Sequence, residues 1–199
     1  MSRRVVITGM GAVTPLGVNV GSFWDGLISG RSGIGEVTHF DTSPFDVRFG
    51  GYCDQFDPKA LFDVRAIKRM DRFAQLALAS SIEAAEEAGL KEGSFEPTRA
   101  GVILGNGIGG LAELEDQHKR LLAKGPGRVS AFTIPKLMAN AGSGHISIHL
   151  GLQVENWCLT MFACGIERIC LWHLTLSVLN SHQECDVGSL VALDQGKLV

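Results

Sequence analysis

The sequence predicts a layered α/β fold, on three observations about its first 150 residues. Two short apolar runs, at residues 4–9 and 101–105, end in glycine and are rich in Val and Ile, which is typical of strands buried on both faces. Longer segments with helical spacing separate or follow these runs. Turn-forming residues punctuate the boundaries. This alternation of strand, turn and helix signals is the pattern of helices packed against a sheet.

After the strand at 4–9, glycines and a proline predict a loop over residues 10–17. A short helix is expected over 23–29, because Ser22 is a suitable N-cap and Gly30 a suitable end. Turn residues dominate the following segment, up to Pro58, which is predicted to be irregular.

The strongest helical pattern runs from residue 63 to 88 as one long, alanine-rich helix that Gly89 closes. Arg65, Lys68 and Arg69 fall in its predicted first turns. Basic side chains at a helix N-terminus oppose the helix dipole, at a few tenths to about 1 kcal/mol per charge. Two interpretations stay open: this basic group meets an anionic partner, or it is an ordinary solvated face.

The second strand, at 101–105, is followed by two predicted helices. Residues 111–124 have mixed charges and indicate an exposed helix. Pro135 suits the first turn of a helix over 136–150. Gly142 and Gly144 lie inside that helix and cost about 1 kcal/mol each relative to alanine. We therefore expect a buried helix that another backbone approaches closely.

Composition excludes several classes of function. The chain has 199 residues, a formal charge of −3 and a pI near 6.1, whereas nucleic-acid-binding domains usually have a basic excess. An uncharged apolar run long enough to span a membrane is not present, and the N-terminus lacks the features of a signal peptide. The five cysteines are odd in number and lack C-x-x-C spacing, so neither a metal site nor a disulfide framework is expected. We expect a cytoplasmic protein.

The chain changes character near residue 153. Only three of the 25 glycines lie beyond this point, but four of the five cysteines do. A clean helical or strand period is not found in the region after Cys158. We therefore divide the sequence into an ordered domain at 1–152 and a divergent tail at 153–199, which is either an atypical segment or the product of a frame shift or unusual splice.

The segment at residues 105–110 reads G-x-G-x-x-G and lies between a predicted strand and a predicted helix. Alone, this motif suggests a dinucleotide-binding loop. The acidic residue that should end a second strand about 20 residues later is missing. A nucleotide-dependent oxidoreductase is therefore a weak alternative, which stabilisation by added NAD(P)H would support.

Taken together, these segments resemble the condensing-enzyme (thiolase-like) family, and within it the β-ketoacyl synthases that elongate chains on a carrier protein. The resemblance covers residues 3–152. It is carried by the segments at 4–17, 31–34, 39–41, 68–73, 105–110 and 144–148.

This resemblance implies a five-layer αβαβα fold of two similar halves, of which the sequence contains the N-terminal half only, and a homodimer. It also implies a decarboxylative Claisen condensation between an acyl thioester and malonyl-carrier. The partner would be an acyl carrier protein that brings its own phosphopantetheine, so no metal, nucleotide or other cofactor is expected. A cysteine thiolate, backbone donors for the oxyanion and two histidines carry this chemistry.

The family's cysteine position falls on Ala163 when counted without gaps, so Cys164 is the candidate nucleophile, one residue out of register. The two family histidines belong to a second half that this sequence lacks. His145 and His149 precede the nucleophile and are interpreted as structural. We expect an inactive fragment of a β-ketoacyl (3-oxoacyl) synthase that acts on acyl-carrier-protein thioesters. The alternative is a non-catalytic half-synthase that retains a docking or dimer surface.

The resemblance also assigns binding residues. Ile108, Phe132 and Thr133 correspond to acyl-chain contacts, with Phe132 reaching a neighbouring subunit's pocket. Carrier docking corresponds to two basic groups. These are Arg65, Lys68 and Arg69 on the predicted long helix, and Lys124 and Arg128 around the turn at 125–127.

Overall fold

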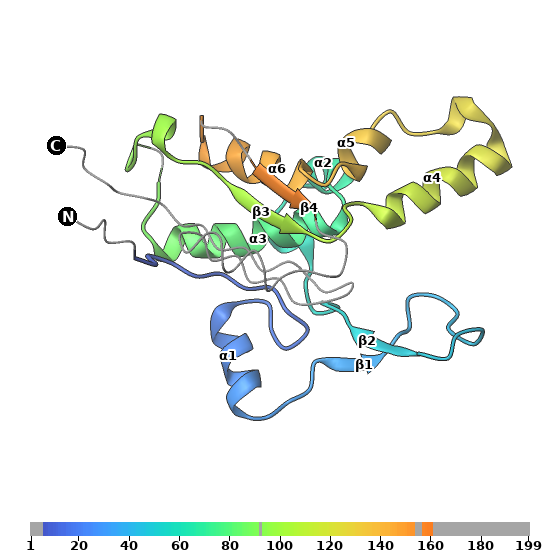
Figure 1. Ribbon diagram of the computed structural model, residues 1–199, viewed down its shortest axis with the longest axis horizontal. Helices are drawn as coiled ribbons and strands as arrows, with labels where there is room; N and C mark the ends of the chain where they lie inside the picture. Colours follow the sequence, from blue (N-terminus) through green and yellow to red (C-terminus); the bar gives the residue numbers. More distant parts are fainter. Residues whose placement is uncertain (1–5, 92, 154–156, 161–199) are drawn as a thin grey trace.

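The computed structural model describes residues 6–91, 93–153 and 157–160, the last four as backbone (Figure 1). The first elements are α1 (Val20–Ile28), β1 (Ile34–Glu36), β2 (Phe49–Gly51), the 3₁₀ helix η1 (Pro58–Ala60), α2 (Val64–Arg69) and α3 (Arg72–Glu87). They are followed by η2 (Pro97–Arg99), β3 (Ile103–Asn106), α4 (Leu111–Lys124), η3 (Pro126–Arg128), α5 (Thr133–Leu137), α6 (Ala141–Leu150) and β4 (Trp157–Thr160). The expected mixture of helix and sheet is therefore present.

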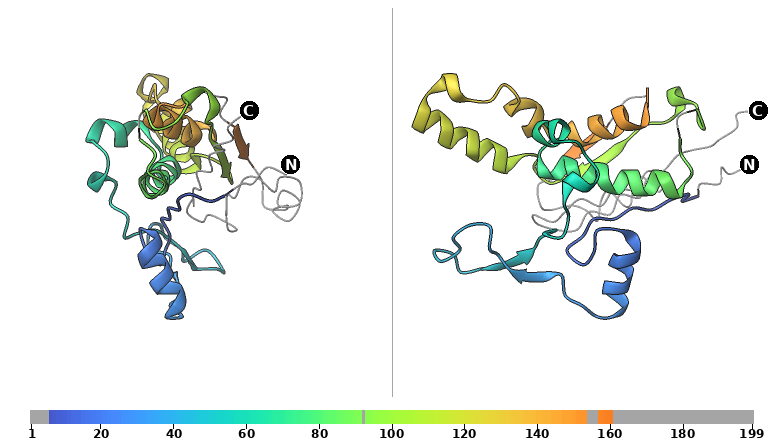
Figure 2. Two further views of the ribbon diagram at one scale, coloured as in Figure 1. Left: turned by 90° about the vertical axis from the view of Figure 1, so that its left-hand side faces the viewer. Right: turned by 180° about the vertical axis from the view of Figure 1, so that it is seen from behind.

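The centre of the molecule is a helical layer on a two-stranded parallel sheet. β3 pairs with β4 in the register Ile103 to Trp157, and α3 and α6 lie together on one face of this pair (Figures 1 and 2). Ala74 and Ala77 of α3 are fully buried, with Leu104 of β3 and Ile146 of α6 packed in the same core. Small side chains on α3 allow this close packing.

α3 also holds the segment that precedes α1. A β-carbon added to Gly11 would lie 1.8 Å from the carbonyl oxygen of Ser80, so the two backbones are in contact there. The Glu83 carboxylate accepts hydrogen bonds from the backbone N–H groups of Ala12 (2.9 Å) and Val20 (2.8 Å). Glu87 accepts another from Met10 N–H. The N-terminal segment is therefore fixed by one helix.

The predicted first strand is not found among the described residues of its segment. Residues 1–5 lie outside the described part of the chain, and residues 6–9 are not in a strand. Val6 and Ile7 are exposed. The sequence pattern identified an apolar run, but a strand also needs a neighbouring backbone to pair with, and no described strand lies beside this segment.

α1 begins three residues earlier than predicted. Asn19, not Ser22, is its N-cap: the Asn19 side chain accepts from Ser22 N–H (2.8 Å), and the Ser22 hydroxyl accepts from Asn19 N–H (3.3 Å). This reciprocal pair is a capping box, in which Ser22 occupies the third helical position. The segment expected to be irregular contains the short antiparallel hairpin β1–β2, which projects with α1 to one side of the molecule (Figure 1).

The predicted long helix is two helices. Met70 is extended (φ −108°, ψ 139°) and buried, and Asp71 is the N-cap residue of α3. Asp63 caps α2, because its carboxylate accepts from the N–H groups of Arg65 and Ala66, both at 2.7 Å. The break lets α2 turn away from α3 while Met70 enters the core.

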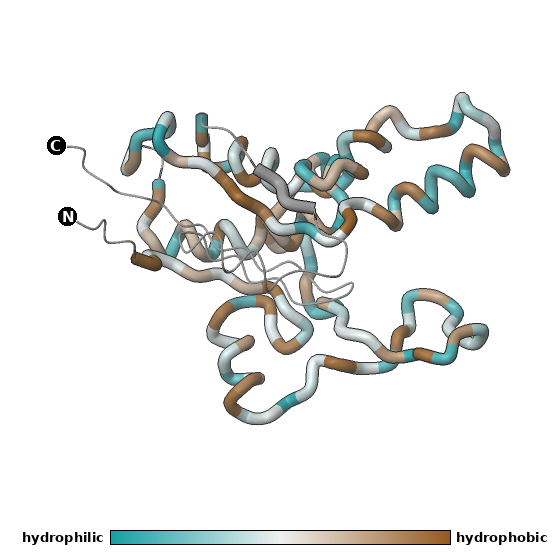
Figure 3. The backbone as a smooth tube through the Cα atoms, in the orientation of Figure 1, coloured by the Kyte–Doolittle hydropathy of each residue, from teal (hydrophilic) through white to brown (hydrophobic). Residues whose placement is uncertain are grey.

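The helix predicted over 136–150 is likewise divided, into α5 and α6, with Met138 as the C-cap of α5 and Asn140 as the N-cap of α6. The helix predicted at 111–124 is confirmed as α4, and Gly125 ends it with a positive φ of 77°. Hydrophilic residues dominate α4, whereas β3 begins with hydrophobic ones (Figure 3). None of the described helices is long and apolar enough to cross a membrane.

Candidate functional site

The glycine-rich turn after β3 packs against protein backbone. β-Carbons added to Gly109 and Gly110 would lie 2.5 Å and 2.7 Å from the carbonyl oxygens of Leu137 and Lys136. Gly110 N–H donates to the Leu137 carbonyl (3.1 Å). The Asn106 side chain joins this contact. Its amide donates to the Ala139 carbonyl (3.2 Å), and its oxygen accepts from Gly109 N–H (3.2 Å).

Carboxylates also surround the N-terminus of α4. A β-carbon on Gly110 would lie 2.9 Å from a carboxylate oxygen of Asp71, and Glu113 is in the first turn of the helix. Desolvation raises the pKa of Asp71, because burial disfavours its charged form, while nearby Lys136 opposes this shift. A phosphate would meet carboxylates here, so the geometry weighs against the dinucleotide interpretation.

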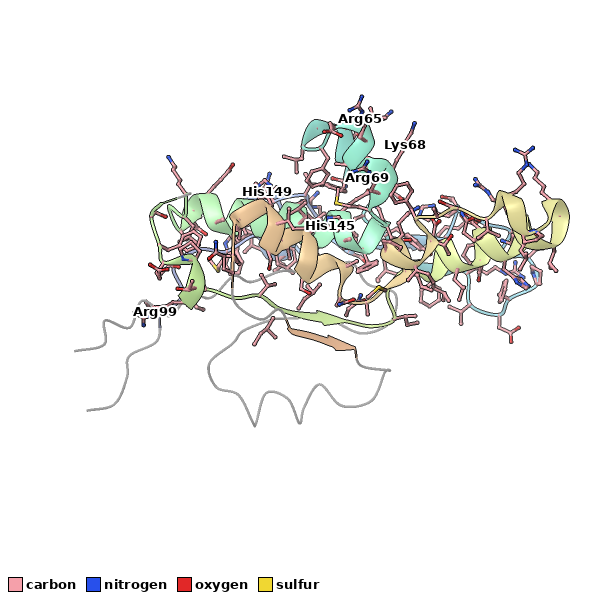
Figure 4. The ribbon with its side chains drawn as sticks, turned by 90° about the horizontal axis from the view of Figure 1, so that it is seen from above. Arg65, Lys68, Arg69, Arg99, His145 and His149 are labelled. Carbon is pink, nitrogen blue, oxygen red and sulfur yellow. The ribbon has the colours of Figure 1, made fainter. Side chains whose placement is uncertain are left out.

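Arg65, Lys68 and Arg69, which we call the α2 triad, lie on the surface of α2. Arg65 and Lys68 project outward from the molecule (Figure 4). Because α2 ends at Arg69, Lys68 and Arg69 occupy its last turn, where the helix dipole favours positive charge. The predicted dipole conflict is therefore wrong for these two residues, and it offers no argument for a partner.

A cavity of about 740 Å³, which we call the α2–α4 recess, lies between α2, α4 and the segment before α5. Its lining residues are Arg65, Lys68, Arg69, Glu113, Asp116, Gln117, Arg120, Ser130, Phe132 and Lys136. The recess brings together a predicted docking group and a predicted acyl contact, because both the α2 triad and Phe132 line it. The Arg69 guanidinium stacks over the Phe132 ring, 5.5 Å from its centroid.

The floor of the recess is a buried polar network. Lys136 forms an ion pair with Glu113, which is 8% exposed. The Gln117 amide donates to the second Glu113 oxygen (3.0 Å), and the Gln117 oxygen accepts from Ser130 N–H (2.9 Å). Each buried polar group thus has a partner. This network fastens the segment that carries Phe132 to α4.

The other predicted acyl contacts are less closely grouped. Thr133 begins α5 and donates from its hydroxyl to the Ser130 carbonyl (2.7 Å). Ile108 lies on the glycine-rich turn, half-exposed, and does not line the α2–α4 recess. The structure therefore does not bring Ile108 and Phe132 into this one cavity. The acyl-chain contacts of Ile108 and Phe132, and the reach of Phe132 into a neighbouring subunit's pocket, stay predictions.

The second predicted docking group lies at the far end of α4. Lys124 is the last residue of the helix and Arg128 ends η3, and both are exposed. The helix has 14 residues, so at a rise of about 1.5 Å per residue its ends are roughly 20 Å apart. Lys124 and Arg128 therefore lie at the C-terminal end of α4, about 20 Å from its first residue. The labelled residues of the α2 triad lie on α2 (Figure 4).

The catalytic candidate Cys164 lies outside the described residues. His145 is half-buried on α6, and desolvation lowers its pKa, while His149 on the same helix is exposed. Both residues belong to the helix that packs on α3 (Figure 4). Among the described residues, there is no group of three or more His, Cys, Asp or Glu side chains that could hold a metal ion.

Comparison with known proteins identifies the family. The Beta-ketoacyl synthase, N-terminal domain family matches residues 2–160. The chain belongs to the β-ketoacyl synthase family. This match extends through β4 to Thr160, beyond the end of the resemblance noted in the sequence.

Among curated relatives, the 3-oxoacyl-[acyl-carrier-protein] synthase 2 of Synechocystis sp. is 46% identical over 163 residues, which is 82% of this chain and 39% of that protein. The enzyme of the same name from Vibrio cholerae is 42% identical over 168 residues, covering 84% of this chain and 41% of that protein. The chain thus spans about two fifths of the length of these β-ketoacyl synthases.

Solved structures agree on the fold. The ishigamide ketosynthase/chain length factor superposes with a TM-score of 0.73 at 28% identity, covering 80% of this chain and 40% of that one. A β-ketoacyl synthase from Burkholderia phymatum gives a TM-score of 0.65 at 24% identity, over 78% of this chain and 39% of that one. The chain therefore has the N-terminal part of the thiolase-like ketosynthase fold, as predicted.

Six residues of the recess were not predicted from the sequence, and Arg120 is the only unpredicted cation among them besides the paired Lys136. Arg120 lines the same recess as Arg69, although 51 residues separate the two. The sequence signal for Arg120 was weak, because it stands in a run of mixed charges on an exposed helix. Among the described residues, its place in the lining distinguishes it from its neighbour Lys119.

Proposed function

We propose that this chain is the N-terminal, carrier-docking part of a 3-oxoacyl-[acyl-carrier-protein] synthase of fatty-acid elongation. The observation that carries the proposal is the family match over residues 2–160, together with relatives of that name at 42–46% identity. In this reaction an acyl group passes from the carrier to a cysteine, and the carbanion formed by decarboxylation of malonyl-carrier attacks the resulting thioester.

The described residues contribute docking and positioning to this proposal. The α2 triad offers three exposed cations at the rim of a recess, and Phe132 offers an aromatic surface in the same recess. Encounters with an acidic carrier are accelerated by such charges and need no large buried interface. The phosphopantetheine arrives on the carrier, so the proposal includes no resident cofactor or metal. It also includes a homodimer and a cytoplasmic location.

Carrier binding by the 199-residue chain tests the docking part. Lys68→Glu with Arg69→Glu should raise the dissociation constant for the holo-acyl carrier protein about tenfold or more at low salt, since each reversal replaces an attraction with a repulsion. The parent interaction should weaken steeply as salt approaches 0.15 M, where exposed charges are screened over about 8 Å.

Lys59→Glu with Lys91→Glu is the matched control, because it changes net charge equally at two exposed lysines that do not line the recess. Equal weakening by both double variants would show that only net charge matters. Undiminished binding by Lys68→Glu with Arg69→Glu would reduce the α2 triad to a solvated face.

Catalysis by the same chain provides a second test. We expect no β-ketoacyl product from acyl-carrier and malonyl-carrier, because the two histidines that the family resemblance requires are not among its six. One lost donor of this kind often costs about 2.7–4 kcal/mol of transition-state stabilisation. Product formation that depends on Cys164, and is lost in Cys164→Ala, would contradict this expectation and establish Cys164 as the nucleophile.

A further inference from the structure

The α2–α4 recess is lined by cations from two helices. The α2 triad lines it from α2, and Arg120, which neither the family resemblance nor the relatives' names assign to any role, lines it from α4. We propose that Arg120 is a further carrier-docking residue, and that the recess receives an acidic segment of the carrier protein between α2 and α4. This inference rests on the proposed function and identifies a second helix that takes part in it.

The rim of the recess carries more positive than negative charge. Five cations and two carboxylates line it, but Lys136 is paired with Glu113 on the buried floor. Within the described part of the chain, no ion pair of 4 Å or less joins a carboxylate to Arg65, Lys68 or Arg120. Asp116 alone therefore opposes four rim cations. Like charges that line one cavity favour an anionic occupant.

The position of Arg120 on α4 gives it a special place among these cations. Asp116, Arg120 and Lys124 are spaced four residues apart, so they follow one face of the helix. Steps of four residues advance about 6 Å along the axis. Arg120 thus lies between the α2 triad and Lys124, which were predicted as separate docking groups. With Arg120 included, cations line the recess from both α2 and α4, and Lys124 follows Arg120 one helical turn further along α4.

This arrangement suits a protein segment better than a small anion. The cations stand on two helices around a cavity of about 740 Å³, each at the end of a long side chain. Several carboxylates spaced along a carrier surface can meet such separate charges one by one, whereas a single phosphate can contact only those that converge. The buried network under the recess keeps α4 in place beside the loop before α5.

The neighbouring residue Lys119 supplies a matched control. Its ammonium pairs with Glu115 at 3.5 Å on the solvent side of α4, and it does not line the recess. Arg120→Glu and Lys119→Glu therefore change the charge of the same helix equally, one position apart. Dissociation constants for the holo-carrier protein would be measured by calorimetry on the 199-residue chain at low salt, with thermal unfolding to verify that each variant folds.

We expect Arg120→Glu to weaken carrier binding about fivefold or more, and Lys119→Glu to change it less than twofold. Arg120→Gln should give an intermediate loss without introducing a repulsive charge. Equal effects of Arg120→Glu and Lys119→Glu would overturn the inference while leaving the proposed function standing, provided that reversal of Lys68 and Arg69 still weakens binding about tenfold or more. A parent chain that does not bind the carrier would overturn the proposed function itself.

Discussion

Two glycines of α6, two residues apart, occupy opposite environments. A β-carbon on Gly142 would lie 2.5 Å from Cδ2 of Leu104, so β3 and α6 approach each other through this missing side chain. At Gly144 the same added atom would have no neighbour within 4 Å among the described atoms. Close approach of another backbone was predicted at both positions. At Gly142 the close neighbours are the side chains of Leu104, Phe73 and Ala77 instead, and at Gly144 no described atom lies close.

Alanine substitution should therefore have opposite effects at these two sites. Gly144→Ala should raise the free energy of unfolding by up to about 1 kcal/mol, because alanine restricts the unfolded chain and favours helix. Gly142→Ala should lower it by about 1–3 kcal/mol through overpacking against Leu104. Denaturant titration followed by circular dichroism measures both. A shift in the same direction for the two variants would contradict the contact at Gly142.

His145 gives the molecule a pH-dependent stability. Burial lowers its pKa below 6.5, so between that lowered pKa and 6.5 the unfolded chain binds more protons than the folded one. This residue's contribution to stability is therefore complete above pH 6.5 and is lost as the pH falls through the window. His145→Gln should reduce the loss of thermal stability between pH 7 and about pH 5. His149→Gln controls for removing an imidazole elsewhere on α6, and an equal effect there would exclude His145 as the cause.

The charges of α2 show how far single residues could be read from the sequence. Neither glycine nor proline marks the end of α2. The sequence therefore predicted one helix from residue 63 to 88, with the basic residues at its N-terminus. The available signal was Asp71, a residue type that often precedes helices. Once α2 ends at Arg69, Lys68 and Arg69 stabilise the helix terminus.

At the scale of elements, α4 depends on a few buried polar contacts. Its exposed surface carries both charges and leucines, and the side chains that fix it to the rest of the molecule include Glu113 and Gln117, 8% and 6% exposed. Gln117 links the helix to the backbone at Ser130. Charge pattern alone predicted an exposed helix, and the sequence could not indicate which two polar residues are buried.

Gln117→Ala should lower the free energy of unfolding by about 1–3 kcal/mol, because Ser130 N–H and one Glu113 oxygen lose their partner in a buried setting. Lys119→Ala, which breaks only the exposed pair with Glu115, should cost less than about 1 kcal/mol. Both variants keep α4 helical, since alanine favours helix. Equal stabilities of the two variants would show that the network does not hold α4.

Across the whole molecule, local patterns identified most helices, while long-range contacts decided the rest. α4 was predicted with its bounds, and β3 within two residues. The breaks at Met70 and between α5 and α6 follow from tertiary packing, as does the union of the α2 triad with Phe132 in one recess. Cavities of this kind form between segments far apart in the sequence, so no local period can reveal them.

Many large apolar side chains are exposed on the surface of the molecule. Trp24 and Ile28, one turn apart on α1, are 61% and 67% exposed. Phe45 and Phe49 are exposed on and beside the hairpin, which projects with α1 from the central layers (Figure 2). Large exposed apolar side chains favour association when a partner covers them. The pair on α1 is therefore suited to association, in keeping with the proposed homodimer.

We predict that the 199-residue chain associates with itself, and that this association responds to salt in the opposite way to carrier docking. Burial of apolar surface is not screened by salt, so sedimentation velocity should show dimers or larger species that persist at about 0.5 M NaCl, where exposed charges interact over less than about 5 Å. Trp24→Ser with Ile28→Ser should shift the chain toward monomer, because it removes two side chains worth about 1.5–3 kcal/mol each when fully buried. Carrier affinity should be unchanged in this variant, since α1 does not line the α2–α4 recess. A monomer at every concentration and salt would contradict the prediction, and self-association that salt dissolves would assign it to charge instead.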